Sequence, residues 1–358
     1  MIRIALVGCG RIAHRHATLL GGGQIEGASL AAVCDRIPER AEAIGSQYGV
    51  PAYTDMEEML QAEERNIDVV SVLTPSGLHA DHVITLSKYR KHIVVEKPMA
   101  LALDDADAML SAVISNGIKL FVVKQNRFNV PVQRLRSALE AGRFSRVFLG
   151  TVRVRWSRDQ AYYDQDSWRG TWALDGGVLA NQASHHIDLL QWMLGDVQSV
   201  FAKSMHALVQ AETEDTAVAV FRFRSGALGV LEATTATRPR DLEGSISILG
   251  EGGTVEIGGF AVNRITTWQF CQPMEDDADV GQRFSVNPPN VYGFGHKAYY
   301  EHVVGCLERG EKPLVDGFEG RKNVELLSAL YESIETGRVI NLRFRPLHCR
   351  LGEKGPHA

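Results

Sequence analysis

Apolar runs of strand length alternate with amphipathic segments over the first third of the chain. The apolar runs predict strands, and the segments between them carry apolar residues at helical spacing. Asp104 is expected to cap one of these helices, which should end at Asn116-Gly117. Strands that are apolar on both faces and separated by helices are typical of a doubly wound parallel sheet, here over residues 1–123. The predicted strands are 2–7, 30–34, 69–73, 93–95 and 120–123.

The pattern changes after Lys124. A helix is predicted over 132–140, and consecutive alternating segments joined by short turns then predict an antiparallel meander that helices cover on one face. Residues 124–358 are therefore expected to form a second domain of the α+β class, with a long loop at 273–290 and a frayed tail at 348–358. The predicted strands are 147–156, 216–223, 227–234, 245–249 and 254–257, and the predicted covering helices are 186–194, 297–308 and 321–336.

Composition limits the class of protein. The 358 residues suit two domains, and the formal net charge of −5 gives no attraction to nucleic acid or to an anionic membrane. No apolar run is long enough to span a bilayer, and a core strand at the N-terminus leaves no room for a signal peptide, so we expect a cytoplasmic protein. The five cysteines, at 9, 34, 271, 306 and 349, lack the spacing of a disulfide framework or a thiolate metal site.

A glycine-containing turn follows the first predicted strand and precedes a predicted helix. Gly8 permits the tight turn, Gly10 lets a pyrophosphate approach the backbone, and Ala13 is small enough for the helix to pack on the strand. Asp35 ends the second strand, where a carboxylate accepts both ribose hydroxyls and repels a 2′-phosphate. The sequence therefore predicts a Rossmann domain that binds NAD. Arg36 keeps NADP open as the alternative, because an arginine there can pair with the 2′-phosphate.

Lys97 stands just past the carboxyl end of a predicted strand, in the run Glu96-Lys97-Pro98. Open α/β sheets bind their ligands at that end of the strands. Pro98 fixes the turn, and Glu96 can orient the lysine ammonium or balance its charge. Lys97 is therefore a candidate for the chemistry, although a surface lysine would give the same tripeptide.

The run from 175 to 190 carries polar groups at helical spacing. If it enters a helix, Asn181 and His185 lie on one face, with Asp188 one turn further on. A neutral imidazole at this place can relay a proton. A metal site built on His185, His186 and Asp188, with His14 and His16 as further candidate ligands, is the alternative, but its spacing matches no usual zinc or iron site, so no metal is predicted. We interpret His186 as a buried structural residue.

These three motifs together resemble those of the glucose–fructose oxidoreductase, inositol dehydrogenase and rhizopine catabolism family, over nearly the whole chain. The resemblance implies a first domain that binds NAD(P) and a second, open-faced sheet that supplies substrate contacts and the interface of a homo-oligomer, dimer or tetramer. It also implies that Lys97 and His185 serve hydride transfer. The family commonly has an aspartate where this chain has Asn181. Since asparagine cannot take a proton, we interpret Asn181 as a hydrogen-bonding positioner.

Four further segments, 124–129, 155–164, 168–177 and 181–186, resemble bacterial enzymes that oxidise C3 of UDP-N-acetylglucosaminuronate for surface polysaccharides such as O-antigen. Such a UDP-sugar substrate carries a carboxylate and a diphosphate, which suits arginines set among aromatic residues. Arg153 shares a strand face with Arg155 and fits a solvated or subunit-facing stripe equally well. The expected substrate contacts are Lys97, Arg155, Arg158, Gln160, Tyr163, Arg169, Asn181 and His185.

The predicted reaction is NAD-dependent oxidation of the C3 hydroxyl. Lys97 is the first candidate for the base, and the division of that role between Lys97 and His185 stays open. A dehydrogenase of a free polyol or simple sugar is the first alternative, and a non-catalytic cofactor-binding sensor is the second. The expected cofactor contacts are Gly8, Gly10, Arg11, Ile12, Asp35, Arg36, Thr74, Ser76, His79, Glu96 and Asn126.

Overall fold

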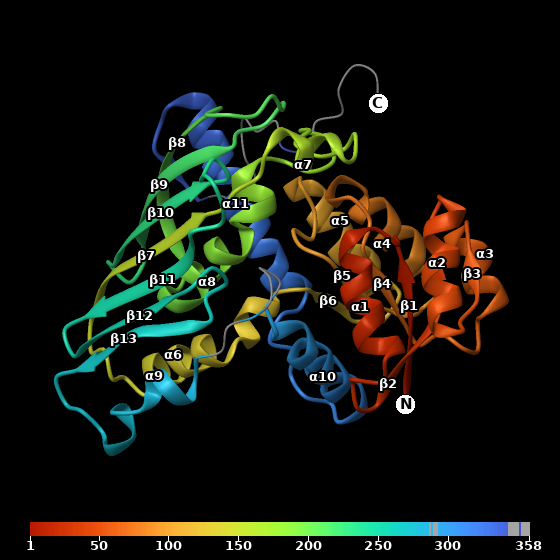
Figure 1. Cartoon of the computed structure of the whole chain (residues 1–358), viewed down its shortest axis with the longest axis horizontal. Helices are drawn as coiled ribbons and strands as arrows, with labels where there is room; N and C mark the ends of the chain where they lie inside the picture. Colours follow the sequence, from red (N-terminus) through yellow and green to blue (C-terminus); the bar gives the residue numbers. More distant parts are fainter. Residues whose placement is uncertain (286–287, 289–292, 343–350, 352–358) are drawn as a thin grey trace. The chain divides into compact units, whose positions relative to one another are not determined.

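The computed structural model describes residues 1–285, 288, 293–342 and 351 (Figure 1). The chain forms two compact units, and each consists of two separate stretches of sequence. Residues 1–123 and 296–324 form the first unit, and residues 124–295 and 325–358 form the second. The segment 296–324, which the sequence pattern assigned to the second domain, therefore packs within the first unit.

The first unit contains a parallel sheet of six strands in the order β3-β2-β1-β4-β5-β6. Every residue of β4 is buried, so both faces of the sheet are covered, as expected for the predicted doubly wound fold. The five predicted strands are all present within a residue or two, and the edge strand β3 has only two residues, too few for a sequence pattern to detect. The strands are β1 (Ile2–Val7), β2 (Ala28–Cys34), β3 (Ala52–Tyr53), β4 (Val69–Val72), β5 (His92–Val95) and β6 (Leu120–Val122).

Helices flank this sheet. The cap predicted at Asp104 is wrong: Ala102 occupies the N-cap, without a side-chain hydrogen bond, and Asp104 lies in the first turn of α5. There its carboxylate still faces the positive end of the helix dipole. The helix ends at Asn116, as predicted. The helices of this unit are α1 (Arg11–Gly21), α2 (Pro38–Tyr48), α3 (Met56–Ala62), the short η1 (Ser76–Leu78), α4 (His79–Ser87), α5 (Leu103–Ser115) and α10 (Gly295–Glu308).

The second unit contains a sheet of eight strands in the order β13-β12-β11-β7-β10-β9-β8-β14. The prediction of a simple antiparallel meander is wrong in one respect. Strands β7 and β10 pair in parallel at the centre, while all other described neighbours are antiparallel. The sheet is therefore mixed but mainly antiparallel. Its strands are β7 (Val147–Arg155), β8 (Val197–Met205), β9 (Thr216–Phe223), β10 (Leu228–Thr234), β11 (Glu243–Gly250), β12 (Gly253–Gly258), β13 (Arg264–Phe270) and β14 (Ile340–Asn341).

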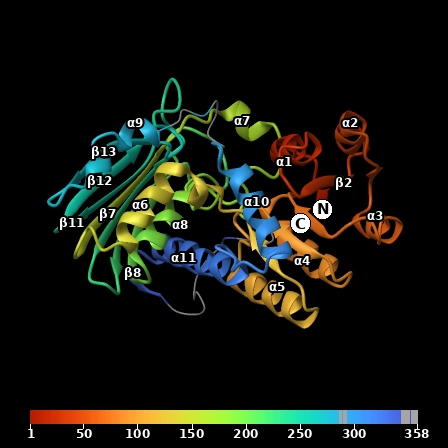
Figure 2. The same ribbon diagram turned by 90° about the horizontal axis from the view of Figure 1, so that it is seen from below.

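Helices of the second unit cover one face of this sheet (Figure 2). Among the predicted covering helices, 297–308 is instead part of α10, whose residues from His296 onward belong to the first unit. Helix α11 crosses from the first unit into the second between Val324 and Glu325. The helices that contain residues of the second unit, besides the first residue of α10, are η2 (Gln125–Phe128), α6 (Val130–Glu140), α7 (Gln160–Asp164), the π-helical turn η3 (Val178–Gln182), α8 (Ser184–Leu194), η4 (Glu275–Asp277), α9 (Val280–Arg283) and α11 (Gly317–Thr336).

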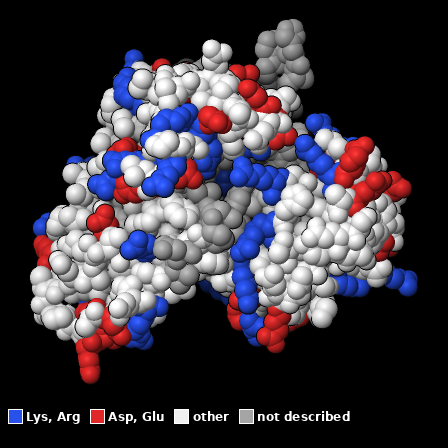
Figure 3. Space-filling view, in the orientation of Figure 1, with Lys and Arg blue, Asp and Glu red and all other residues white. Residues whose placement is uncertain are grey.

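The opposite face of the second sheet carries exposed apolar side chains. Val218, Val220, Leu228 and Val230 alternate along β9 and β10 with buried residues, so all four project from the uncovered face. Over the part of the molecule visible in Figure 3, basic and acidic side chains are interspersed. Self-association through the open face stays a prediction.

The remaining sequence predictions concern loops, cysteines and membrane segments. The loop predicted at 273–290 contains η4 and α9 in its described part, and 286–287 and 289–290 lie outside the described residues. The tail from 348 and Cys349 also lie outside them, except for Leu351, which is buried. The four described cysteines are free thiols. Within the described chain no helix combines the length and apolarity needed to cross a bilayer.

Candidate active site

The turn between β1 and α1 has the geometry that a pyrophosphate requires. Gly8 has φ +96°, and a Cβ there would lie 2.8 Å from the backbone carbonyl carbon of Leu73, so both conformation and space demand glycine. Gly10 begins α1 without a side-chain cap, and a Cβ on it would meet no atom within 4 Å. The first turn of the helix therefore opens onto a space where its N–H groups and dipole favour an anion. Arg11 is exposed and Ile12 half-buried at the start of this helix.

Asp35 joins this turn to the end of β2. One of its carboxylate oxygens accepts a hydrogen bond from the Cys9 backbone N–H at 2.7 Å, and the other accepts from the Ile37 N–H at 2.9 Å. Each oxygen keeps a further lone pair, so the carboxylate remains able to accept ribose hydroxyls. Arg36 is exposed beside it. The residues of the turn and of the β2 end thus fit a dinucleotide.

The loop after β4 is held by a buried histidine. His79 is 1% exposed, and its ring nitrogens lie 2.8 Å from the Thr74 carbonyl oxygen and 2.9 Å from the Pro98 carbonyl oxygen. Burial lowers the pKa of His79 to about 4, so the ring is neutral and donates to one carbonyl at a time. His79, predicted as a cofactor contact, therefore fixes backbone. Thr74 and Ser76 are partly exposed at the same strand end.

Lys97 lies in the first unit, directly after β5. It is partly exposed, whereas Glu96 and Pro98 on either side are buried. The carboxylate of Glu96, predicted as a cofactor contact, instead bonds to the buried ring of His16 at 3.0 Å. The lysine is thus the member of the Glu96-Lys97-Pro98 run whose side chain is accessible at the carboxyl edge of the sheet.

The candidate residues of the second unit lie around the start of α8. The prediction that Asn181 and His185 share one α-helical face is wrong, because Asn181 lies in the π-helical turn η3 and α8 begins only at Ser184. The amide nitrogen of Asn181 donates to the carboxylate of Asp175. Since a carboxylate only accepts, this bond fixes the flip of the amide and turns its oxygen away from Asp175. His185 is 7% exposed in the first turn of α8.

Asp188 belongs to a buried ion pair. Its carboxylate is 2% exposed and forms a two-pronged ion pair with Arg127, at 2.8 and 2.9 Å. The ammonium of the buried Lys124 lies 3.7 Å away. Burial alone would raise the pKa of Asp188, but these two cations lower it below the ordinary value. Asn126, which was predicted as a cofactor contact, precedes Arg127 in η2 and is buried.

Among the three predicted substrate arginines, Arg155 pairs with two glutamates. It lies on the open face of β7, where its Nε and Nη2 donate to Glu232 at 2.6 and 2.7 Å and its Nη1 to Glu243 at 3.0 Å. Arg153 on the same face also pairs with Glu243. Both arginines therefore belong to a row of paired charges on the open face of the sheet. This agrees with the solvated or subunit-facing stripe that the sequence analysis kept as an alternative for Arg153.

Arg158 and Arg169 instead lie close to the ring of one tyrosine. Their guanidinium carbons are 5.5 and 4.6 Å from the ring centroid of Tyr162, and Arg169 also donates to the Tyr162 hydroxyl at 2.9 Å. Asp241 pairs with Arg158, and Asp166 with Arg169. We call Arg158, Arg169 and Tyr162 the arginine–tyrosine cluster.

The two neutral contacts predicted beside this cluster, Tyr163 and Gln160, both have partners of their own. Tyr163 is buried, with its hydroxyl 3.3 Å from the Thr235 hydroxyl, and burial raises its pKa to about 12. Gln160 is exposed and bonds to Asp164 and to the backbone of Gln210. Tyr162, which the sequence analysis did not select, is the member of the Tyr162-Tyr163 pair that contacts the two arginines, and the contact of Tyr163 with substrate stays a prediction.

Glu214 is a buried residue that the sequence analysis missed. It is 4% exposed, and one carboxyl oxygen accepts from the Leu179 N–H at 3.1 Å and contacts the Tyr331 hydroxyl at 3.0 Å. A Cβ on Gly177 would lie 2.1 Å from this carboxyl group, so a larger residue there would have to displace the Glu214 side chain. Glu214 thus holds the start of the turn that carries Asn181.

Burial raises the pKa of Glu214 to about 7 from an ordinary 4.5. Between these values the folded chain keeps a proton that the unfolded chain loses, so this group's contribution to the free energy of unfolding is full below pH 4.5, falls as the pH rises, and is gone above about 7. The loss is about 3 kcal/mol at about 1.4 kcal/mol per unit. Glu214→Gln should remove it, so urea unfolding should show the variant gaining stability relative to the parent between pH 5 and pH 8. An equal difference at both pH values would contradict this.

Known proteins resemble this chain along its whole length. Residues 2–124 match the family model for an oxidoreductase NAD-binding Rossmann fold, and residues 136–342 match the model for the C-terminal alpha/beta domain of the same oxidoreductase family. Myo-inositol 2-dehydrogenase of Thermotoga maritima is 30% identical over 348 residues, covering 95% of this chain and 98% of the relative. The chain belongs to the glucose–fructose oxidoreductase, inositol dehydrogenase and rhizopine catabolism family.

Two solved members of this family are more similar still. The WlbA dehydrogenase of Bordetella pertussis, in complex with NADH and UDP-GlcNAcA, is 41% identical with a TM-score of 0.85, covering 96% of this chain and 99% of that one. The WlbA dehydrogenase of Chromobacterium violaceum, with the same two ligands, is 42% identical with a TM-score of 0.88, covering 96% of both chains. As a member of this family the chain is an NAD-dependent dehydrogenase that acts on a CH–OH group.

Proposed function

We propose that this dehydrogenase oxidises the C3 hydroxyl of UDP-N-acetylglucosaminuronate to a ketone in bacterial surface-polysaccharide synthesis. The observation that carries the proposal is the arginine–tyrosine cluster, which offers cations and an aromatic ring to an anionic nucleotide sugar. The two WlbA dehydrogenases, crystallised with NADH and UDP-GlcNAcA, support the same substrate class. An uncharged polyol would leave the two arginines of the cluster without an anionic ligand.

In the proposed mechanism, Lys97 accepts the proton of the C3 hydroxyl. The turn at Gly8 and Gly10 and the carboxylate of Asp35 would hold NAD, which supplies a hydride acceptor when bound. As the C3–H bond breaks and its electron pair leaves with the hydrogen, the C3 hydroxyl must lose its proton to form the carbonyl. Lys97, as the free amine, takes that proton and becomes an ammonium. Our proposal keeps His185 as a partner in this proton transfer and Asn181 as a hydrogen-bond acceptor that orients the sugar.

Arg158 is our choice for the carboxylate at C6 of the sugar. In the described part of the chain its hydrogen bonds all use Nη1, toward Asp241 and the Ser157 carbonyl, so Nε and Nη2 remain for a two-pronged bond to a carboxylate. Arg169 uses Nε, Nη1 and Nη2 for Asp166 and Tyr162, and Arg155 uses all three nitrogens for glutamates. The number of donor nitrogens that remain for a ligand therefore favours Arg158 among the three arginines, which sequence alone left equal.

The test compares UDP-N-acetylglucosaminuronate with UDP-N-acetylglucosamine, which lacks only the carboxylate. The parent enzyme should prefer the uronate in kcat/KM by about 10–100-fold, the value of one charged hydrogen-bonded contact. Arg158→Leu should lose most of this preference by lowering kcat/KM for the uronate alone. Steady-state NADH formation with both sugars and both proteins measures it.

Arg155→Leu is the matched control, and it should keep the preference because the guanidinium that it removes is committed to Glu232 and Glu243. Equal rates of the parent enzyme with both UDP-sugars would contradict the proposal. The second candidate, a free polyol or simple sugar, is favoured by the inositol dehydrogenases among the relatives. Comparable kcat/KM with myo-inositol would move the function there.

A further inference from the structure

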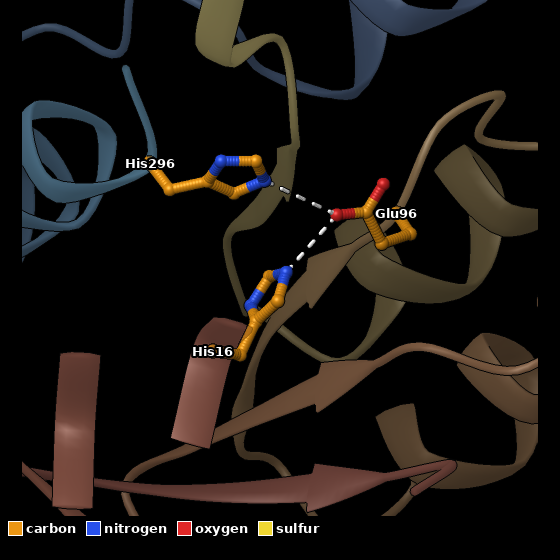
Figure 4. A group of neighbouring side chains, drawn as sticks. All are labelled: His16, Glu96 and His296. Atoms are coloured by element: carbon orange, nitrogen blue, oxygen red, sulfur yellow. Dashed lines mark hydrogen bonds and ion pairs between the residues drawn. The ribbon is translucent and has the colours of Figure 1, made fainter. Parts of the chain in front are cut away.

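Three buried side chains from distant segments of the first unit meet beside Lys97. His16 comes from α1, Glu96 from the end of β5 and His296 from α10, and Figure 4 shows both rings directed at one carboxylate oxygen. That oxygen, Oε1 of Glu96, lies 3.0 Å from Nε2 of His16 and 3.9 Å from Nε2 of His296. The other oxygen accepts a hydrogen bond from the backbone N–H of Lys97 at 3.0 Å. Glu96 therefore connects the two histidines to the main chain of the lysine.

The contacts continue from His16 into the core. Its Nδ1 lies 2.6 Å from the Tyr300 hydroxyl, which lies 3.0 Å from the hydroxyl of Ser71 in β4. Burial alone would raise the pKa of Glu96, but the hydrogen bond with His16 and the nearby ring of His296 hold it well below the ordinary value, so the carboxylate accepts. With a neutral ring, His16 Nε2 donates to Glu96, Tyr300 donates to His16 Nδ1, and Ser71 donates to Tyr300. In the described part of the protein these contacts reach Ser71, which is 0% exposed, so they lie wholly in the core.

A metal ion is the competing explanation, because two imidazoles and a carboxylate are common ligands. Hydrogen bonds already engage the ligand atoms of His16 and Glu96. Both nitrogens of His16 and both oxygens of Glu96 have protein partners at ordinary hydrogen-bond distances. The His16–Glu96 pair is therefore explained without a cation, and the metal content of the protein distinguishes the two explanations.

We propose that Glu96 and His16 act as a pair of positioning residues for Lys97. The length of the Glu96 side chain sets the place of the lysine backbone, and His16 holds the carboxylate in place. On the other side of the lysine, His79 contacts the Pro98 carbonyl at 2.9 Å, so both neighbours of Lys97 are anchored by buried rings. This inference rests on the proposed role of Lys97 and adds residues that themselves do not touch the substrate.

Two substitutions at Glu96 separate length from charge. Glu96→Gln keeps the length of the side chain. Its amide oxygen can still accept from the Lys97 N–H, and its NH₂ group can donate to Nε2 of His16. His16 then carries its proton on Nδ1 and donates to the Tyr300 hydroxyl. Glu96→Asp keeps the charge but is one methylene too short to reach both partners. If Glu96 positions Lys97, E96D should lower kcat by about tenfold or more and leave KM for NAD unchanged. The kcat of E96Q should stay within about threefold of the parent value.

His16→Phe should lower kcat as much as E96D, and the double variant should be no worse than either, since both changes release the same anchor. Rates are measured with whichever sugar the parent oxidises fastest. A larger loss in E96Q than in E96D would overturn the inference, as would an equimolar metal in the parent that E96Q lacks, measured by elemental mass spectrometry.

A second measurement does not depend on turnover. Competitive labelling with acetic anhydride, read by peptide mass, reports the reactivity of the Lys97 amine against that of Lys203, a lysine of the second unit. E96D should change the ratio and E96Q should not, and an unchanged ratio in E96D would overturn the inference even if no sugar were oxidised. If Lys97→Ala remained active while E96D altered the labelling, the proposed function would fail and the positioning would stand.

Discussion

Replacing Lys97 with alanine should lower kcat for sugar oxidation by about 10²–10⁴-fold, the usual contribution of one general base. Binding of NADH should hardly change, because the pyrophosphate site at Gly8 and Gly10 and the ribose site at Asp35 do not involve the lysine side chain. Steady-state kinetics give kcat, and titration calorimetry gives the Kd for NADH.

Lys91→Ala is the matched control for this prediction. Lys91 precedes the same strand at its opposite end, and its ammonium bonds to the backbone carbonyl of Glu64 at 2.6 Å. Its removal should leave kcat at the parent value. If K97A kept more than about a tenth of the parent activity, well above what loss of a general base allows, Lys97 would not be the base.

Asp188→Asn should cost about 3–5 kcal/mol of the free energy of unfolding, the usual effect of removing one partner from a buried ion pair. The side chains of Asp188, Arg127 and Lys124 are 3%, 4% and 1% exposed, so the substitution removes a buried negative charge that both cations contact. Urea denaturation followed by circular dichroism measures the difference.

Glu140→Gln provides the comparison for an exposed pair. Glu140 pairs with Arg136 four residues earlier on α6 at 2.8 Å, and its side chain is 62% exposed. Loss of this pair should cost no more than about 0.5 kcal/mol. Similar losses in E140Q and D188N would show that Asp188 is not stabilised by its buried partners.

The sequence pattern predicted those parts of the fold that depend on a few consecutive residues. Strands of the first sheet are buried on both faces, so they stand out as apolar runs, and the turn at Gly8 can be recognised because glycine is needed there for conformation and space. The same holds for Lys97, whose position after β5 follows from the strand itself. The Rossmann domain, NAD and the lysine all come from this short-range information.

The rest depends on contacts between distant residues. The return of 296–324 to the first unit, the parallel pairing of β7 with β10, and the ion pair of Asp188 with Arg127 each join segments that no short window contains. Glu214 and His16 are selected by burial and partners, and neither lies in a run with unusual composition. Tyr162 was missed for a smaller reason, because one residue of rotation along α7 decides which tyrosine faces the arginines.

The fate of the hydrogen on C3 tests the central claim most directly. UDP-N-acetylglucosaminuronate carrying deuterium at C3 is mixed with the enzyme and NAD, and the NADH formed is examined by mass spectrometry. The account predicts NADH with one deuterium and a UDP-linked 3-keto uronate in equal amount, because the hydride comes from C3 as Lys97 takes the hydroxyl proton. NADH without deuterium, or no NADH from this sugar, would contradict it.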